Sequence, residues 1–288
     1  MIVLTHVCSI TKGGKSLSLL ISLTVLGVTA GGAQAQINIG GSNPITYSQD
    51  FNTPVLANTG ATASFTNNVT LTGLYATRAG VAPTTYRISN GSDTADGLYS
   101  YGATGNSDRA LGSLISSVNN VFFGFRFVNT SPGLVITSFN LQYTGEQWRR
   151  ATNINNQQQQ LSFSYAIFNA NTGSINDPNE YNSYSNLNFV VTGTGALAGV
   201  TAPITTQSFN QTVSLEDQDE EVLPGQELWI RWQDTNDSGT DHGLAVDNIQ
   251  ATFTLVPEIS TLQAMLLAGA VAILPAWRIA RRRKSNTL

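Results

Sequence analysis

The chain has 288 residues, of which 11% are charged, and its formal net charge is −4. Between Gln36 and Glu258, seven arginines and no lysine stand against 18 acidic residues, which gives this stretch a net charge of −11. Such a surface repels phosphate backbones and offers no basic patch, so nucleic acid is excluded as a partner. Because Cys8 is the only cysteine and lies near the N-terminus, the rest of the chain has neither a disulfide nor a thiol nucleophile.

The first 35 residues have the three parts of a secretory signal peptide. A weakly basic start that ends at Lys15 is followed by an apolar stretch, Leu17–Val28, and by the small-residue site Ala33-Gln34-Ala35. We therefore expect signal peptidase to cleave after Ala35. The alternative is a retained membrane helix, but an apolar stretch of about 12 residues is too short to span the hydrocarbon core.

The middle of the chain, residues 36–255, has an apolar periodicity of two, as in Leu161, Phe163, Tyr165 and Ile167. This alternation is typical of half-buried antiparallel strands. Similar runs cover 121–128, 134–143, 188–191, 227–232 and 244–255, with turn residues between them. The sequence predicts one all-β domain, a jelly-roll-like β-sandwich or, as the alternative, an immunoglobulin-like Greek key. The run Gln157–Gln160 is expected at a loop edge.

Aromatic side chains near residue 148 are candidates for ligand binding. Trp148 and Tyr143 have flat apolar faces on which a sugar could stack, and Arg149 could donate hydrogen bonds to hydroxyl groups. Polar residues follow Trp148, so we expect its ring to be exposed. The alternative is that these aromatic residues belong to the core of the sandwich.

An acidic loop after residue 233 is the best candidate for a metal site. Asp234, Asn236 and Ser238 have the spacing of the first half of a calcium loop, and Asp241 could add a carboxylate. An EF-hand is excluded, because Ala245 stands where that motif places its glutamate. The alternatives are a β-hairpin calcium loop and a plain polar turn whose side chains cap backbone N–H groups.

Asp247 is a further candidate, because it alternates with Ile249, Ala251 and Phe253 along the predicted strand. These apolar side chains are expected to face the core, so the carboxylate of Asp247 is expected to face it too. A buried carboxylate requires a cation or hydrogen-bond donors. The candidate partners are a calcium ion shared with Asp50, or an arginine such as Arg231. A β-bulge next to Asp247 would shift the alternation by one residue, and Asp247 would then not be expected to face the core.

The histidine content limits the possible chemistry. After the leader the sequence holds one histidine, His242, so a zinc site with several histidines is excluded. A Ser-His-Asp triad on His242 is an alternative without a supporting Gly-x-Ser-x-Gly motif. We expect His242 to be a turn residue whose ring bonds the acidic loop. No catalytic residue is predicted.

The C-terminal residues 256–288 form a second targeting segment. Val256-Pro257-Glu258 precede a mostly apolar stretch, 259–277, that is long enough to span a membrane, and a basic tail, 278–288. This order resembles the PEP-CTERM sorting signal of Gram-negative bacteria, although Ile259 replaces the second proline of the motif. The resemblance implies that the tail holds the exported protein at the inner membrane until an exosortase removes it. The alternative is a permanent single-pass anchor.

Five stretches of the middle domain also resemble an extracellular bacterial module that is often seen in PEP-CTERM proteins. They are 49–53, 109–114, 143–149, 161–165 and 231–248. This resemblance implies fold and location more than activity. We therefore expect a non-catalytic protein of the cell surface or extracellular matrix that binds polysaccharide or serves adhesion. The alternative is a secreted hydrolase of glycans or esters that uses carboxylates of the acidic loop.

Overall fold

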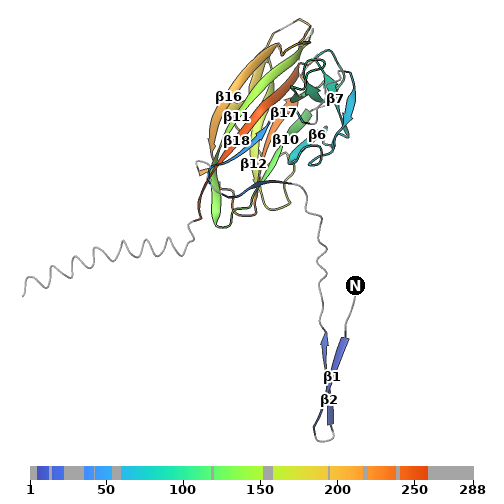
Figure 1. The fold of residues 1–288 in the computed structure, drawn as a ribbon, viewed down its shortest axis with the longest axis vertical. Helices are drawn as coiled ribbons and strands as arrows, with labels where there is room; N and C mark the ends of the chain where they lie inside the picture. The colour runs from blue at the N-terminus through green and yellow to red at the C-terminus, as the bar shows by residue number, and fades with distance from the viewer. Residues whose placement is uncertain are drawn as a thin grey trace, which may run out of the picture. The chain divides into compact units, whose positions relative to one another are not determined.

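The computed structural model describes residues 5–12, 15–22, 36–41, 43–53, 60–117, 120–151, 158–193, 195–216, 220–237 and 241–258 (Figure 1). The chain divides into two compact units, residues 1–34 and 35–288. In the first unit, β1 (Thr5–Lys12) and β2 (Lys15–Ser22) pair as an antiparallel hairpin. The predicted cleavage site at Ala35 lies outside the described residues, so cleavage stays a prediction.

The second unit is an all-β sandwich, and its first layer is a seven-stranded sheet. The central order of this sheet is β13-β12-β17-β10-β3, while β14 also pairs with β12 and β6 with β10. The strands are β3 (Ile37–Ile39), β6 (Leu74–Arg78), β10 (Asn120–Asn129), β12 (Gln158–Phe168), β13 (Asn182–Ser183), β14 (Phe189–Thr192) and β17 (Glu227–Thr235).

The second layer is a nine-stranded sheet with the order β15-β11-β18-β9-β8-β7-β5. In addition, β16 pairs with β11 and β4 pairs with β18. The strands are β4 (Ile45–Gln49), β5 (Thr62–Ser64), β7 (Thr85–Ser89), β8 (Gly97–Tyr101), β9 (Ala110–Leu114), β11 (Leu134–Arg150), β15 (Leu197–Ala198), β16 (Thr205–Ser214) and β18 (Gly243–Pro257).

Aromatic side chains from both sheets fill the space between them. The ring centroids of Tyr143 on β11 and Trp232 on β17 lie 5.2 Å apart, and those of Phe127 on β10 and Phe253 on β18 lie 4.9 Å apart. Because alternate residues of a strand point to opposite faces, one face of each sheet supplies this core. The predicted two-sheet sandwich is therefore confirmed.

Most of the long apolar runs in the sequence are strands, as predicted. No α-helix occurs among the described residues, and η1 (Ser185–Leu187) is a 3-10 turn. The glutamine run leads into a strand, because residues 158–160 begin β12 and Gln159 is buried, while Gln157 lies outside the described residues. No described helix is long and apolar enough to cross a membrane. The predicted span 259–277 lies outside the described residues.

The last strand, β18, positions much of the candidate site. On one side it pairs with β11 along nearly its whole length. On the other side it pairs first with β9, at Leu244–Val246, and then with β4, at Ile249–Phe253. Asp247 and Asn248 lie where the neighbour changes, and Asn248 has a φ of 51°. The alternation of side chains shifts by one residue at this point, as in a β-bulge.

Candidate functional site

Asp234 lies inside the sandwich on β17, with 4% of its surface exposed. Ser113 on β9 donates a hydrogen bond from Oγ to Asp234 Oδ2 at 2.6 Å. This bond joins the two sheets. Burial raises the pKa of Asp234 to about 8, and the nearby Asp241 adds to the increase.

Asp241 is also buried, and its hydrogen-bond partner is a side chain of β12. Gln159 donates from Nε2 to Asp241 Oδ1 at 3.2 Å, and the backbone N–H of His242 donates to Gln159 Oε1. The other carboxylate oxygen, Asp241 Oδ2, has no hydrogen-bond partner in the described part of the chain. Burial, with a contribution from Asp237, raises the pKa of Asp241 to about 7.

The ring of His242 is fully buried, and no hydrogen bond joins it to the described residues of the acidic loop. Residues 238–240 of that loop lie outside the described residues, so a bond between the ring and the loop stays a prediction. His242 Nδ1 accepts the backbone N–H of Ala151 at 3.1 Å, and Nε2 has no partner among the described residues. Burial and the charge of Arg150 lower the pKa of His242 to about 4. The ring is therefore neutral at physiological pH. Its Nδ1 is occupied by a backbone N–H, and within the described ranges no carboxylate orients the ring as in a catalytic triad.

The acidic loop is only partly described, because Ser238 lies outside the described residues. Asn236 is exposed, whereas Asp234 and Asp241 are enclosed with different partners. Within the described residues, no three His, Cys, Asp or Glu side chains converge as a metal site. The unpartnered oxygen of Asp241 is a ligand of the kind that calcium takes. Calcium binding at this loop stays a prediction.

Asp247 does not face the main core, so its predicted orientation is wrong. Leu244 and Val246 contact the core before the bulge and Ile249 contacts it afterwards, which places Asp247 on the opposite face together with Ala245. The sequence alternation failed here because the strand changes its neighbour at this residue.

Asp247 is nevertheless buried. Asn248 donates from Nδ2 to Asp247 Oδ2 at 2.8 Å, while Oδ1 has no partner among the described residues. Burial raises the pKa of Asp247 to about 8, and the charges of Glu146, Asp108 and Asp50 add to the increase. A calcium ion shared by Asp50 and Asp247 stays a prediction.

Arg231, the alternative partner for Asp247, lies elsewhere. Its guanidinium carbon lies 3.4 Å from the ring centroid of Tyr181, and NH1 donates to the carbonyl oxygens of Ile175 and Asp177. Arg231 therefore stacks on the outer side of the seven-stranded sheet and does not neutralise Asp247.

The predicted aromatic platform is not exposed. Tyr143 faces the core, where its hydroxyl donates to the carbonyl of Leu187 at 2.6 Å. Trp148 is only 5% exposed, so the prediction that its ring is exposed is wrong. Its ring stacks with that of Tyr101 on the outer side of the sheet, and its Nε1 donates to Glu146 Oε2 at 2.7 Å.

Arg149 is half-buried and helps to cover this aromatic cluster. Its NH1 donates to the carbonyl oxygen of Gly91 at 3.2 Å. A Cβ at Gly91 would collide with the carbonyl of Trp148, and Gly91 has a φ of 88°. The loop after β7 therefore needs glycine to lie this close to β11. Tyr143, Trp148 and Arg149 are accounted for as packing residues.

The predicted sorting motif begins inside the domain and ends at its surface. Val256 and Pro257 pair with Val135 and Leu134 as the end of β18. Glu258 is exposed, and its backbone N–H donates to the carbonyl of Gly133 at 2.9 Å. The tail predicted to follow, residues 259–288, lies outside the described residues. Sorting stays a prediction.

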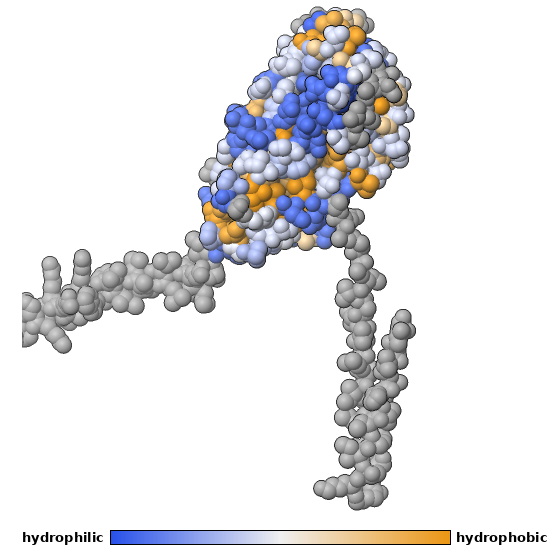
Figure 2. All heavy atoms as spheres, in the orientation of Figure 1, coloured by the Kyte–Doolittle hydropathy of each residue, from blue (hydrophilic) through white to orange (hydrophobic). Residues whose placement is uncertain are grey.

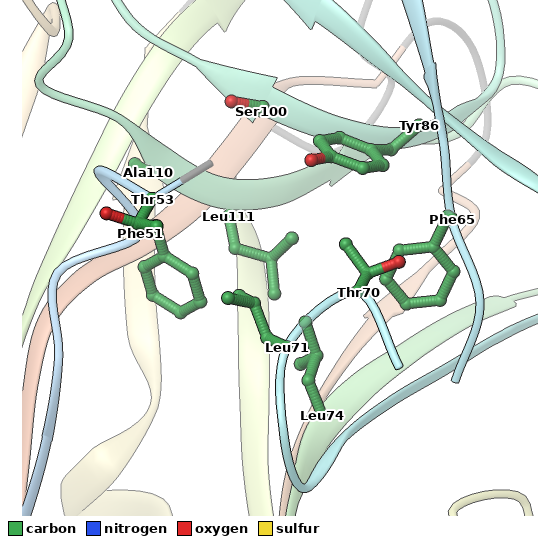
Figure 3. Close-up of a pocket in the computed structure, with 10 residues that line it drawn as sticks. All are labelled: Phe51, Thr53, Phe65, Thr70, Leu71, Leu74, Tyr86, Ser100, Ala110 and Leu111. Carbon is green, nitrogen blue, oxygen red and sulfur yellow. The ribbon is translucent and has the colours of Figure 1, made fainter. Parts of the chain in front are cut away.

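A small internal cavity lies between β9 and the segment before β6 (Figure 3). Figure 3 shows Phe51, Phe65 and Leu71 converging toward Leu111. The cavity has a volume of about 20 Å³, enough for one water molecule. Ligand sites usually need roughly 300 Å³ or more, so this cavity cannot take a sugar ring.

The outer face of the nine-stranded sheet carries a regular array of uncharged polar side chains, which sequence reasoning missed. The array spans four adjacent strands, and alternate residues on the same strands face the core. We call it the polar grid; its two rows are Thr212, Asn140, Thr252 and Thr46, and Asn210, Gln142, Gln250 and Ser48. Figure 2 shows hydrophilic side chains gathered where Figure 1 draws β16, β11 and β18. The sequence pattern that could have predicted the polar grid is the alternation of polar and apolar residues in 138–142 and 250–254.

No protein-family model matches the chain, and no curated protein sequence matches it. Among solved structures, the chain is similar to the K3 cleaved adhesin domain of Lys-gingipain from Porphyromonas gingivalis W83, with 16% identity, a TM-score of 0.28, and coverage of 53% of this chain and 76% of that one. It is also similar to TmCBM61 in complex with β-1,4-galactotriose, with 10% identity, a TM-score of 0.24, and coverage of 54% and 74%.

A third similar structure is described as a promiscuous carbohydrate-binding module of the β-sandwich superfamily. The identity is 12% and the TM-score 0.26, with coverage of 88% of this chain and 85% of that one. With TM-scores this low, these likenesses carry no argument about what this chain binds.

Proposed function

We propose that this protein is exported and acts outside the cell as a non-catalytic component of the surface or matrix, where it binds polysaccharide or serves adhesion. The observation that carries the proposal is the contrast between its enclosed and its open polar groups. Asp234, Asp241 and Asp247 are buried, whereas the polar grid lies open on the sheet surface. Amide and hydroxyl groups both donate and accept hydrogen bonds, which suits them to sugar hydroxyls.

The secondary proposal concerns delivery. A leader cleaved after Ala35 and a C-terminal tail read by an exosortase would place a jelly-roll-type domain beyond the inner membrane. The order of motif, apolar stretch and basic tail in 256–288 supports this. Mass spectrometry of the mature protein should find Gln36 at its N-terminus. The tail should be lost only in cells that contain the exosortase, and a full-length tail in both strains would favour the permanent anchor.

A hydrolase is the second candidate function, because raised carboxyl pKa values are a property of general acids. The pKa values of Asp234 and Asp241 are raised to about 8 and about 7. Both side chains are enclosed, which favours a structural role for them.

The two candidates are separated by assaying the purified chain on the same panel of polysaccharides for retention and for release of reducing ends. Retention without release is expected. Release of reducing ends that is lost in Asp234→Asn would establish the hydrolase instead.

A further inference from the structure

We propose that the polar grid is the binding surface and that its ligand is a neutral, hydroxyl-rich polysaccharide chain lying flat across β16, β11, β18 and β4. This inference rests on the proposed function and adds the place of binding and the class of ligand. It begins from the register of the four strands. Gln142 lies opposite Asn210 on one side and Gln250 on the other, and Gln250 lies opposite Ser48.

The dimensions of the grid follow from sheet geometry. Adjacent strands lie about 4.8 Å apart, and side chains on one face repeat about every 6.8 Å along a strand. Four strands therefore present a polar surface about 15 Å across from the first strand to the last. That width accommodates several sugar units of an extended chain, whereas a single small polar molecule would engage only one corner of it.

Hydrogen bonds within the grid hold its side chains in place. Asn140 donates from Nδ2 to Asn210 Oδ1 at 2.9 Å, and the hydroxyls of Thr46 and Thr252 lie 3.0 Å apart. Gln142 donates from Nε2 to Gln250 Oε1 at 3.3 Å. Side chains that are already ordered lose less conformational entropy when a ligand binds. The grid is thus preorganised, and its free lone pairs and N–H groups remain open at the surface.

The chemistry of the grid excludes other classes of partner. None of its eight side chains is charged or large and apolar. A protein partner generally requires an apolar centre in the interface, and nucleic acid requires basic groups. Dense hydroxyl groups that both donate and accept hydrogen bonds are the complement of this surface, and neutral polysaccharides have them.

The charges beside the grid favour a neutral over an anionic polysaccharide. Asp50 lies beside Ser48 in the chain and in the adjoining hollow, and Glu146 lies on β11 beyond Gln142, so two acidic residues stand beside one end of the grid. The stretch from residue 36 to residue 258 has a net charge of −11. Uronic acid or sulfate groups on a bound chain would be repelled from this end of the grid.

The grid continues into a hollow beside β4. Ser48 and Gln250, which belong to the grid, line it together with Asp50 and Asn248, and its volume is about 440 Å³. This volume lies within the range of about 300–1,000 Å³ that is usual for small-molecule sites. A sugar unit or a side branch of the chain would fit in the hollow while the main chain lies on the grid.

The test is affinity electrophoresis of the full chain in gels that contain hydroxyethylcellulose, galactomannan or, as an anionic polymer, alginate. The grid variant is Gln142→Ala with Gln250→Ala, and Asn210→Ala on the edge strand β16 is a second, independent one. The matched control is Gln160→Ala with Gln233→Ala, on the outer face of the seven-stranded sheet. Equal thermal unfolding of all variants shows that the fold is kept.

We expect a neutral polymer to retard the wild type and the control, and the double grid variant to bind at least tenfold more weakly. Alginate should not retard any of them. If the grid variants are retarded as strongly as the wild type, the polar grid is not the binding surface, but the proposed function stands. Stronger binding to alginate than to the neutral polymers overturns the ligand class. If no polysaccharide retards the wild type, the proposed function fails together with this inference.

Discussion

Ser113 on β9 and Asp234 on β17 join the two sheets of the sandwich by a hydrogen bond of 2.6 Å, although 121 residues separate them in the chain. The bond lies in the interior, and both residues are buried. It gives the carboxyl group of Asp234 a partner that water would otherwise provide.

Replacing Ser113 tests this link. Ser113→Ala leaves a buried carboxyl group without its donor, which should reduce the free energy of unfolding by about 1–3 kcal/mol. Urea denaturation measures the change. Ser162→Ala, on the outer face of β12, is the control and should stay within about 0.5 kcal/mol of the wild type. A loss no larger than that of the control would show that the bond does not stabilise the domain.

The buried aspartates predict a dependence of stability on pH. The pKa values of Asp234 and Asp247 are raised on folding from 3.8 to about 8, and that of Asp241 to about 7. An acid of this kind stabilises the fold fully below its unfolded pKa, and the contribution is lost as the pH rises toward the folded value. His242 acts in the opposite direction, but only between its folded pKa of about 4 and its unfolded value of 6.5.

Between pH 6.5 and 8 the aspartates therefore determine how stability depends on pH, and the free energy of unfolding should fall as the pH rises. Summed over the three groups, the loss is on the order of 4 kcal/mol, because one pKa unit corresponds to about 1.4 kcal/mol for each group. Urea denaturation in the presence of a chelator, at several pH values, measures it. Asp247→Asn should flatten the slope. Stability that is constant or rises over this interval would contradict the pKa assignments.

Calcium binding is a separate prediction. Calcium takes oxygen ligands, and Asp241 Oδ2 and Asp247 Oδ1 are both buried without a partner in the described part of the chain. A hundredfold excess over Kd stabilises the folded state by about 2.7 kcal/mol, which should raise the Tm by roughly 5–10 °C for a domain of this size. Differential scanning calorimetry of the chelated protein with added calcium measures this.

Magnesium is the control for the calcium titration, because it prefers a tighter octahedral site. Two variants distinguish the sites. Asp241→Asn should remove the effect if calcium binds the acidic loop, and Asp247→Asn if it binds beside Asp50. An identical Tm with and without calcium ends the hypothesis.

Trp148 is predicted to stabilise the fold without binding sugar. Trp148→Ala should cost about 3–5 kcal/mol, as is usual for a buried tryptophan. Trp148→Phe keeps the stacking with Tyr101 and loses only the bond to Glu146, so it should fold and bind polysaccharide as the wild type does. Weaker binding by a folded Trp148→Phe protein would restore the aromatic platform as the binding site.

The sequence was sufficient to predict the fold class and the longest strands. Runs such as 121–128 and 227–232 are rich in apolar and aromatic residues, and they became β10 and β17. The edge strand β16 escaped notice because only two of its side chains, Phe209 and Val213, are buried and apolar. An edge strand with one neighbour carries a weak periodic signal.

The candidate site was harder to predict, because its geometry depends on tertiary neighbours. The orientation of Asp247 follows from the replacement of β9 by β4 beside β18, which no local pattern reports. The burial of Trp148 depends on the approach of Gly91, 57 residues earlier in the chain. The polar grid, by contrast, was visible as alternation and needed only the register of four strands to become a surface.

The pairing of β4 with β18 has a consequence for the order in which the protein can fold. β4 ends at Gln49, and the strand beside it begins at Gly243, so the chain must emerge almost completely before β4 finds its partner. Contacts this far apart in sequence are slow to form. An early strand with an unpaired edge also invites association with other chains. If the protein is threaded through a membrane from its N-terminus, its first strands must be shielded until the last one arrives, which makes it a natural client for a chaperone on the far side.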